Sequence, residues 1–314
     1  MDPACRFPYE ANNRASFLEL DVRRLAAEDI AGMFEPDTLR LLAGCAPCQP
    51  FSTYSRKGRI TRDDQKWELV IDFCRIVRDL QPELVTMENV PQLLDHPVFE
   101  QLKLALVNYN VWCGSVECSK YGVPQTRKRF VLLASRLGPI SLVPVTHKGA
   151  KIRTVRNAIA ELPPLSAGGA DPGDPLHYAS SLSKKNLKRI RASLPGGTWR
   201  DWPAYLRAEC HTKMTGETYP SVYGRMSWDI PAPTITTQCF GYGNGRFGHP
   251  RQDRAISLRE AAILQTFPRS YKFVSTGERV RFSTLGRLIG NAVPVRLGEI
   301  VGRSLVQHVR RIAG

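Results

Sequence analysis

Short apolar runs alternate with amphipathic stretches over the first part of the chain. Residues 39–45 (LRLLAGC), 83–87 (ELVTM), 111–118 and 129–134 (RFVLLA) are compact apolar runs that predict β-strands. Between the first two runs, the apolar side chains of residues 65–80 recur every three or four positions, as on one face of an α-helix. This alternation predicts an α/β domain with a largely parallel sheet.

The hydrophobic pattern then weakens and later recovers. Residues 136–255 are rich in proline and glycine and have little periodicity. The run SLRE (257–260) has the spacing of a capping box at a helix start, and residues 294–311 predict a closing helix. The sequence therefore divides into an α/β domain (1–135), an irregular insert (136–255) and a C-terminal segment (256–314) that returns to the first domain.

Composition restricts the class of protein. The 314 residues are 42% hydrophobic and 23% charged, as in ordinary globular proteins. There is no apolar run of the ~18 residues that span a bilayer, and no secretory signal. The eight cysteines are too dilute for a disulfide scaffold and are interpreted as free thiols. These features predict a cytoplasmic protein.

Charge points to a polyanionic partner. The formal net charge is +15, with 44 lysines and arginines against 29 acidic residues, and such an excess favours nucleic acid. A membrane surface fits the charge too, but the chain has no basic amphipathic anchor. The insert holds 17 basic and 8 acidic residues, and its densest basic run is 183–191 (SKKNLKRIR). This run is either a solvated helix face or a nucleic-acid contact, and we favour the contact.

A Cys-x-x-Cys pair, Cys45 and Cys48, follows the first predicted strand. It is open to four interpretations: a redox pair, half of a zinc site, a buried structural thiol, or a nucleophile on the loop after a strand. A zinc site needs further ligands, and the nearest other cysteines are too widely spaced. The polar loop 53–62 that follows carries four basic side chains, which suits a lid over a phosphate backbone.

Polar residues also mark two later strands. Glu88 stands at the end of the strand that begins near residue 83, where open α/β sheets place their ligands. A carboxyl group there could be protonated and donate to a ring nitrogen, or it could be a helix-capping or surface carboxylate. Arg127 and Arg129, at i and i+2, should point to the same face of the next strand.

The order of these motifs carries a specific resemblance. It rests on five segments in sequence: PCQPFS (47–52), ENV (88–90), QTRKR (125–129), SLREAAILQTFP (257–268) and GNAVP (290–294). Together they closely resemble the DNA cytosine-5 methyltransferase family. The resemblance implies a Rossmann-like S-adenosylmethionine-dependent methyltransferase sheet, with the insert as a smaller, irregular target-recognition domain.

The resemblance also implies a mechanism on double-stranded DNA. A cytosine is flipped out of the duplex, and Cys48 attacks carbon 6 of its ring. Glu88 binds the ring at N3 and the exocyclic amine, while Arg127 and Arg129 hold the base and the neighbouring backbone. Carbon 5 takes the methyl group from S-adenosylmethionine, and loss of the C5 proton releases Cys48. The family needs no metal.

Six further residues match the family's cofactor positions. They are implied to line the adenine and methionine pockets for S-adenosylmethionine: Asp21, Val22, Pro47, Leu69, Asn291 and Val293. The family's opening glycine-rich turn, of the type FAGxGG, has no match in this sequence. The sheet is therefore expected to lack its first strand, and apolar surface is expected to be exposed there.

This departure keeps other functions open. The alternative is a non-catalytic or split-enzyme DNA-binding subunit that needs a second subunit for cofactor binding. A cytosine-5 methyltransferase that acts on RNA shares much of the motif set and also remains possible. The resemblance further suggests a prokaryotic, nucleoid-associated enzyme of a restriction-modification system, with a cognate restriction endonuclease as a partner.

Overall fold

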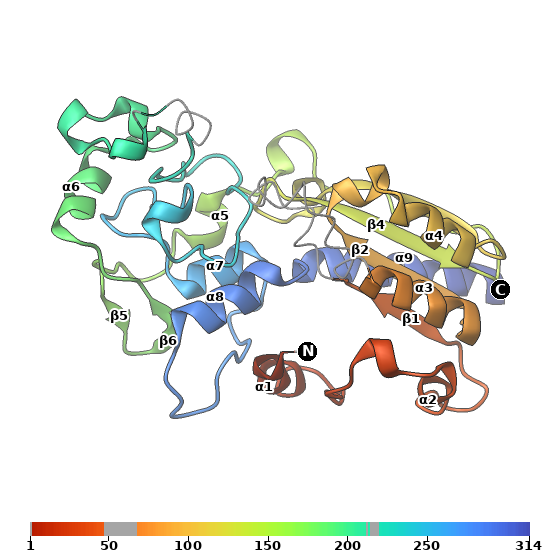
Figure 1. The fold of residues 1–314 in the computed structure, drawn as a ribbon. Coiled ribbons are helices and arrows are strands. Elements are labelled where there is room, and N and C mark those ends of the chain that lie inside the picture. Colours follow the sequence, from red (N-terminus) through yellow and green to blue (C-terminus); the bar gives the residue numbers. More distant parts are fainter. Residues whose placement is uncertain (1, 47–67, 212, 214–219) are drawn as a thin grey trace.

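Two lobes lie side by side, one built on a four-stranded sheet and one made of short helices, a two-stranded sheet and irregular loops (Figure 1). The computed structural model describes residues 2–46, 68–211, 213 and 220–314. The strands are β1 (Leu41–Gly44), β2 (Leu84–Asn89), β3 (Asn110–Glu117), β4 (Lys128–Ser135), β5 (Ala170–Asp171) and β6 (Asp174–Tyr178). The α-helices are α1 (Arg6–Glu10), α2 (Ala27–Ala31), α3 (Glu68–Leu80), α4 (Val98–Ala105), α5 (Val155–Ile159), α6 (Lys184–Ala192), α7 (Leu258–Leu264), α8 (Phe282–Asn291) and α9 (Val295–Ala313).

The sheet of the first lobe has the order β1-β2-β4-β3. β1 and β2 are parallel, with Gly44 opposite Met87, whereas β4 pairs antiparallel with both β2 and β3. The expectation of a largely parallel sheet is therefore wrong, and the sheet is mixed. The link between β3 and β4, residues 118–127, is too short for a crossover helix, so these strands can only pair antiparallel.

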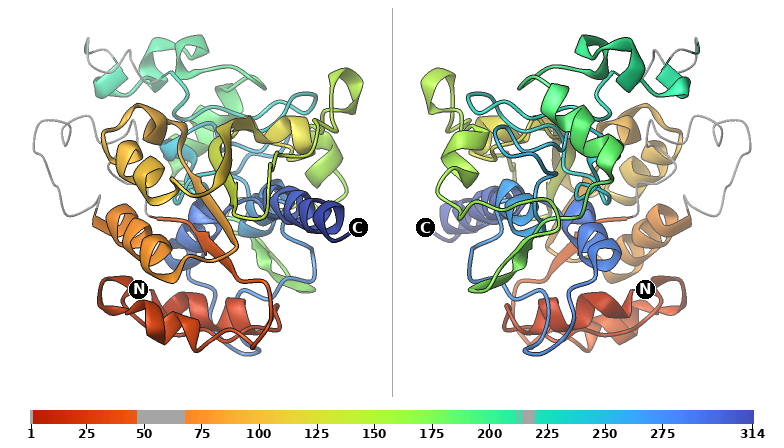
Figure 2. Two further views of the ribbon diagram at one scale, coloured as in Figure 1. Left: turned by 90° about the vertical axis from the view of Figure 1, so that its right-hand side faces the viewer. Right: turned by 90° about the vertical axis from the view of Figure 1, so that its left-hand side faces the viewer.

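Helices cover both faces of this sheet (Figure 2). α3 and α4 bury Val70, Cys74 and Leu102 against the side chains of β2 and β4 on one face. α9 places Leu297 and Leu305 against the opposite face. The predicted amphipathic helix and the predicted closing helix are thus confirmed by α3 and α9. In the described part of the chain β1 lies at a sheet edge, where Leu41 is 40% exposed.

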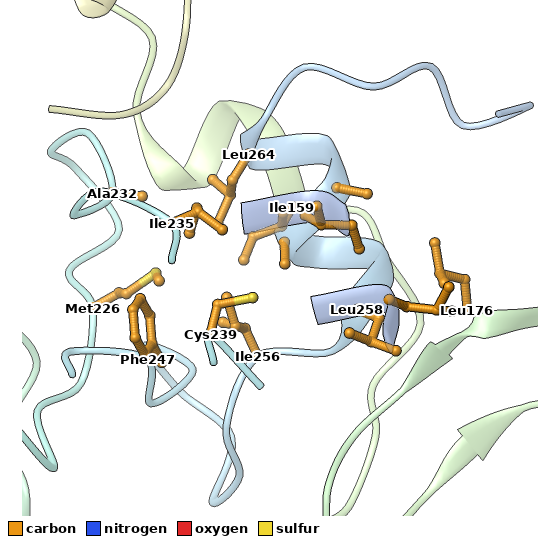
Figure 3. Packing of buried hydrophobic residues seen from close by; sticks show 14 of the residues in the cluster. Ile159, Leu176, Met226, Ala232, Ile235, Cys239, Phe247, Ile256, Leu258 and Leu264 are labelled. Carbon is orange, nitrogen blue, oxygen red and sulfur yellow. The ribbon is translucent and has the colours of Figure 1, made fainter. Parts of the chain in front are cut away.

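The second lobe joins parts of the insert to the helices that follow it. Its largest apolar cluster combines Met226, Ile235 and Phe247 of the insert with residues of α7 and α8 (Figure 3). The capping box predicted at α7 is present: Ser257 Oγ accepts from Glu260 N, and the Glu260 carboxylate accepts from Ser257 N. Of the segment 256–314, α7 and α8 thus pack in this lobe, while α9 packs on the sheet.

The basic run on α6 has two kinds of cation. The side chains of Lys184, Lys185 and Lys188 are exposed. Arg189 is buried instead: its guanidinium lies 5.6 Å from the ring centroid of Trp202 and 5.1 Å from that of Tyr223. Cation–π contacts of this kind hold the aromatic core of the insert together. The run is therefore partly a structural element rather than a uniform charged face.

Candidate active site

Glu88 lies where the ends of three strands meet. Because β1 and β2 are parallel, their carboxyl ends lie at the same edge of the sheet, and β4 begins there because it runs antiparallel to β2. Glu88, next to last in β2, faces the α9 side of the sheet, opposite to Met87, which packs against α3 and α4. Gly44 ends β1 beside α3, and a Cβ there would lie 2.5 Å from the Phe73 ring.

The Glu88 carboxyl group is mostly buried and lies between a thiol and a guanidinium. Its side chain is 14% exposed, and Oε2 accepts a hydrogen bond from Cys45 Sγ at 3.3 Å. Arg129 Nε lies 2.8 Å from Oε1, but Oε1 accepts no hydrogen bond from any described residue. The contact is therefore an ion pair whose N–H is not aimed at the oxygen. Burial raises the pKa of the Glu88 carboxyl, and Arg129 opposes this shift.

The predicted nucleophile, Cys48, and the neighbouring Pro47 lie outside the described residues. The described chain stops two residues short of Cys48, at Ala46, directly after β1. The carbonyl of Ala46 accepts a hydrogen bond from Asn89 Nδ2 at 3.2 Å, so the end of β2 fixes the start of the segment that leads to Cys48. The basic loop 53–62 lies in the same undescribed segment.

Arg127 and Arg129 differ in their surroundings. Arg129, on β4, pairs with Glu88. Arg127 is 3% exposed, and its guanidinium donates to the carbonyls of Ile235, Gly290 and Ala292 at 3.0–3.4 Å. Arg127 thus connects the sheet lobe to the insert and to the turn between α8 and α9.

The end of α8 and the turn that leads to α9 carry two of the predicted cofactor residues. Asn291 is exposed, and Val293 packs against a cluster that includes residues of α9. Gln265 Nε2 donates to the carbonyls of Ile289 and Ala292, and Arg127 also binds the Ala292 carbonyl. Hydrogen bonds from two separate elements therefore hold this turn.

A second group of predicted cofactor residues lies beside the start of α3. The short 3-10 turn Val22–Arg24 is held by Arg75 of α3, whose guanidinium donates to the carbonyls of Val22 and Leu25. Leu69 is half-buried in the first turn of this helix. The Asp21 carboxylate accepts from Arg23, which lowers the pKa of Asp21 to about 2. The Asp21 carboxylate takes four hydrogen-bond contacts from Arg23, so an amine hydrogen of a ligand would replace one of them.

Sequence reasoning missed the contacts that link these residues. The sequence groups Cys45 with Cys48, whereas the structure shows a hydrogen bond from Cys45 to Glu88. Gln125 is fully buried: its side chain donates to Leu264 O and Gln265 Oε1 and accepts from Ile235 N. A sequence signal for this contact exists: Gln125 and Gln265 are amides inside otherwise basic or apolar motifs. A buried amide must be hydrogen-bonded, so each of them predicts a polar partner.

The described residues contain no cluster of three or more His, Cys, Asp or Glu side chains that could hold a metal ion. In the same part of the chain, no helix combines the length and the apolar character needed to cross a membrane.

Comparison with known proteins identifies the family. The model for "C-5 cytosine-specific DNA methylase" matches residues 1–307. The Type II methylase M.HgiDII of Herpetosiphon aurantiacus is 49% identical over 309 residues, which cover 97% of this chain and 86% of the relative. The Type II methyltransferase M1.BsuMI of Bacillus subtilis is 32% identical over 267 residues, covering 83% of this chain and 59% of the relative.

Solved structures agree in fold. A putative DNA modification methyltransferase encoded within an Escherichia coli prophage superimposes with a TM-score of 0.71 at 22% identity, covering 98% of this chain and 91% of that one. The Dnmt2 methyltransferase of S. pombe gives a TM-score of 0.61 at 16% identity, with 98% and 89% covered. These likenesses show the fold of DNA methyltransferases. The chain belongs to the family of C-5 cytosine-specific DNA methylases.

Proposed function

We propose that this chain transfers a methyl group from S-adenosylmethionine to carbon 5 of a cytosine flipped out of double-stranded DNA, through a covalent bond between Cys48 and carbon 6. The observation that carries the proposal is the Glu88 carboxyl group. It is mostly buried at the meeting point of three strand ends, and its Oε1 accepts no hydrogen bond from any described residue. A buried polar atom of this kind is suited to a ligand.

Glu88 has the hydrogen-bonding pattern that a cytosine edge requires. A protonated carboxyl group offers one O–H donor and one carbonyl acceptor. The edge of cytosine offers an acceptor at N3 beside a donor at the exocyclic amine. Because burial raises the pKa of Glu88, the protonated form is favoured more than at an exposed site. Donation to N3 withdraws electrons from the ring and makes carbon 6 open to attack.

The chain's residues then carry the proposed reaction. The Cys48 thiolate adds to carbon 6, and the electron pair of the 5,6 double bond moves to carbon 5, stabilised by the proton that Glu88 shares with N3. S-adenosylmethionine, when bound, would supply an electrophilic methyl group for that carbon, and its sulfonium would leave as a neutral thioether that keeps the bonding electron pair. A base then removes the proton from carbon 5, the double bond re-forms and Cys48 leaves as the thiolate, so the enzyme is regenerated.

The cofactor would lie between two sets of residues. Asp21 and Val22 with Leu69 would hold the adenine end, and Asn291 and Val293 would hold the other end, together with Pro47. The accessible Asp21 carboxylate and the firmly held turn between α8 and α9 support this assignment. Arg129 would keep the Glu88 side chain in place, and Arg127 would hold the two lobes in register around the flipped base.

A mechanism-based duplex tests the proposal whatever the target sequence is. A long duplex is made with 5-fluorocytosine in place of every cytosine. Fluorine at carbon 5 cannot leave as a proton does, so the adduct stays on the enzyme. We expect a complex that survives denaturation with the wild-type chain and S-adenosylmethionine, and none with Cys48→Ser.

Cys113→Ser, which changes an exposed cysteine on β3, is the matched control and should trap like the wild type. A trapped complex with Cys48→Ser would refute the covalent role of Cys48. Transfer of labelled methyl groups to transfer RNA rather than to duplex DNA would refute the proposed substrate. The expected second subunit and restriction endonuclease stay predictions.

A further inference from the structure

We propose that Cys45 is a positioning residue for Glu88, an inference that rests on the proposed function. Its thiol donates a hydrogen bond to Glu88 Oε2 and thereby fixes the rotation of the carboxyl group and the direction in which Oε1 points, beside its ion-pair partner Arg129. The observation behind it is the 3.3 Å distance between Cys45 Sγ and Glu88 Oε2.

The fold itself sets the position of this thiol. Parallel pairing sets Gly44 opposite Met87, so Cys45, which directly follows β1, is brought close to Glu88, the next residue of β2. The end of β1 is held closely because Gly44 lies against the Phe73 ring, where a Cβ would clash at 2.5 Å. Asn89 ties the following carbonyl, that of Ala46, to β2. The backbone on both sides of Cys45 is therefore fixed.

Other groups do not fix the carboxyl group in the same way. Arg129 approaches Oε1 as an ion pair, without an aligned hydrogen bond. In the described part of the chain, the Glu88 carboxyl group accepts a hydrogen bond from the Cys45 thiol. A hydrogen bond at Oε2 adds a directional contact on the second oxygen to the attraction that Arg129 exerts at Oε1. The thiol thus supplies an orientation that the arginine does not.

Two substitutions at Cys45 separate hydrogen bonding from packing. Cys45→Ser keeps a donor at the same position, because the serine hydroxyl can donate to the Glu88 carboxyl oxygen as the thiol does. Cys45→Ala removes the donor. We expect kcat for methyl transfer to fall about tenfold in Cys45→Ala, with KM for DNA unchanged, and to stay within about twofold of the wild type in Cys45→Ser. Cys113→Ala, at an exposed cysteine on β3, should change neither constant.

The pH dependence provides a readout that loss of packing would not change. The hydrogen bond from Cys45 lowers the pKa of Glu88, so Cys45→Ala should raise that pKa further. If the protonated carboxyl is the active form, the alkaline limb of kcat then moves to higher pH in Cys45→Ala and stays in place in Cys45→Ser.

A titration without substrate keeps the test independent of activity. The chain is labelled with ¹³C at the glutamate carboxyl carbons, and the Glu88 signal is identified by its loss in Glu88→Gln. We expect a higher Glu88 pKa in Cys45→Ala than in the wild type or Cys45→Ser. The same pKa in all three proteins, or equal loss of kcat in both variants, would overturn the positioning role. Absence of methyl transfer by the wild type would instead count against the proposed function alone.

Discussion

Glu88 allows binding and chemistry to be separated by a single substitution. In Glu88→Gln the amide can still donate to cytosine N3 and accept from its amine, but it cannot share a proton as an acid does. We expect kcat for methyl transfer to fall by about 10²- to 10⁴-fold, while KM for duplex DNA changes less than about threefold. Steady-state kinetics with labelled cofactor measure both constants.

Glu117→Gln is the matched control: Glu117 makes exposed ion pairs with Lys120 and Lys128 at the end of β3, so its substitution should leave both constants unchanged. A large rise in KM for Glu88→Gln at constant kcat would mean that Glu88 serves binding rather than chemistry.

His249 makes stability depend on pH. It is 2% exposed, and burial lowers its pKa to about 4, although Glu260 nearby opposes the shift. At pH values between about 4 and the unfolded pKa near 6.5, the unfolded chain binds one more proton at His249 than the folded chain does. The free energy of unfolding therefore falls as the pH falls. Acidification from pH 7 to pH 5 should therefore cost about 2 kcal/mol through this residue.

His249→Asn isolates this contribution, because the Asn oxygen can accept from the Arg251 and Gln252 amides as Nδ1 does. The measurement is unfolding at both pH values, followed by tryptophan fluorescence. Trp228 is one reporter, because its ring centroid lies 5.3 Å from that of His249. An equal loss of stability in the wild type and the variant would exclude the histidine as its source.

At the scale of elements, α8 and the insert are joined by close backbone contact. A Cβ at Gly290 would lie 2.3 Å from backbone atoms of Thr236 and Thr237, which cannot rotate away. We expect Gly290→Ala to lower the free energy of unfolding by at least about 2 kcal/mol. It should also lower methyl transfer, because Arg127 binds the Gly290 carbonyl.

Gly298→Ala on α9 is the opposite case. A Cβ at Gly298 meets nothing within 4 Å, so this substitution should stabilise the helix by about 0.5–1 kcal/mol. Urea denaturation of both variants gives the comparison. Equal effects of the two substitutions would show that contact with the insert does not matter to stability.

Elements were easier to predict from the sequence than their directions. The apolar spacing of α3 and the capping box of α7 are local, so the sequence alone reveals them. Strand direction is not local, because an apolar run indicates burial but not the direction of the strand. For β3 and β4 the short link 118–127 determines the antiparallel direction.

The same limit applies to the candidate site. Ordered motifs singled out Glu88 and Arg129, which the structure brings into contact. The partner of Cys45 and the carbonyls bound by Arg127 follow from strand register and lobe packing, which no single motif contains.

At the scale of the whole molecule, the net charge of +15 should make DNA binding strongly dependent on salt. The exposed lysines of α6 are the place to test where DNA contacts the insert. Lys184 and Lys185 are exposed, unlike the buried Arg189, so they can be changed without loss of the aromatic core. If both contact phosphates, Lys184→Gln combined with Lys185→Gln should reduce the slope of log K against log salt concentration by about 2.

A double variant on α9 provides the control at equal charge. Arg303 and Arg310 are exposed on the helix that covers the sheet, in the other lobe from α6. Arg303→Gln with Arg310→Gln removes the same two charges, and a partner that responded only to net charge would bind both double variants equally. We expect the α6 variant alone to lose slope, because counterions are released where cations meet phosphates. Fluorescence anisotropy of a labelled duplex at four salt concentrations measures the slopes, and equal slopes for the two variants would place the DNA away from α6.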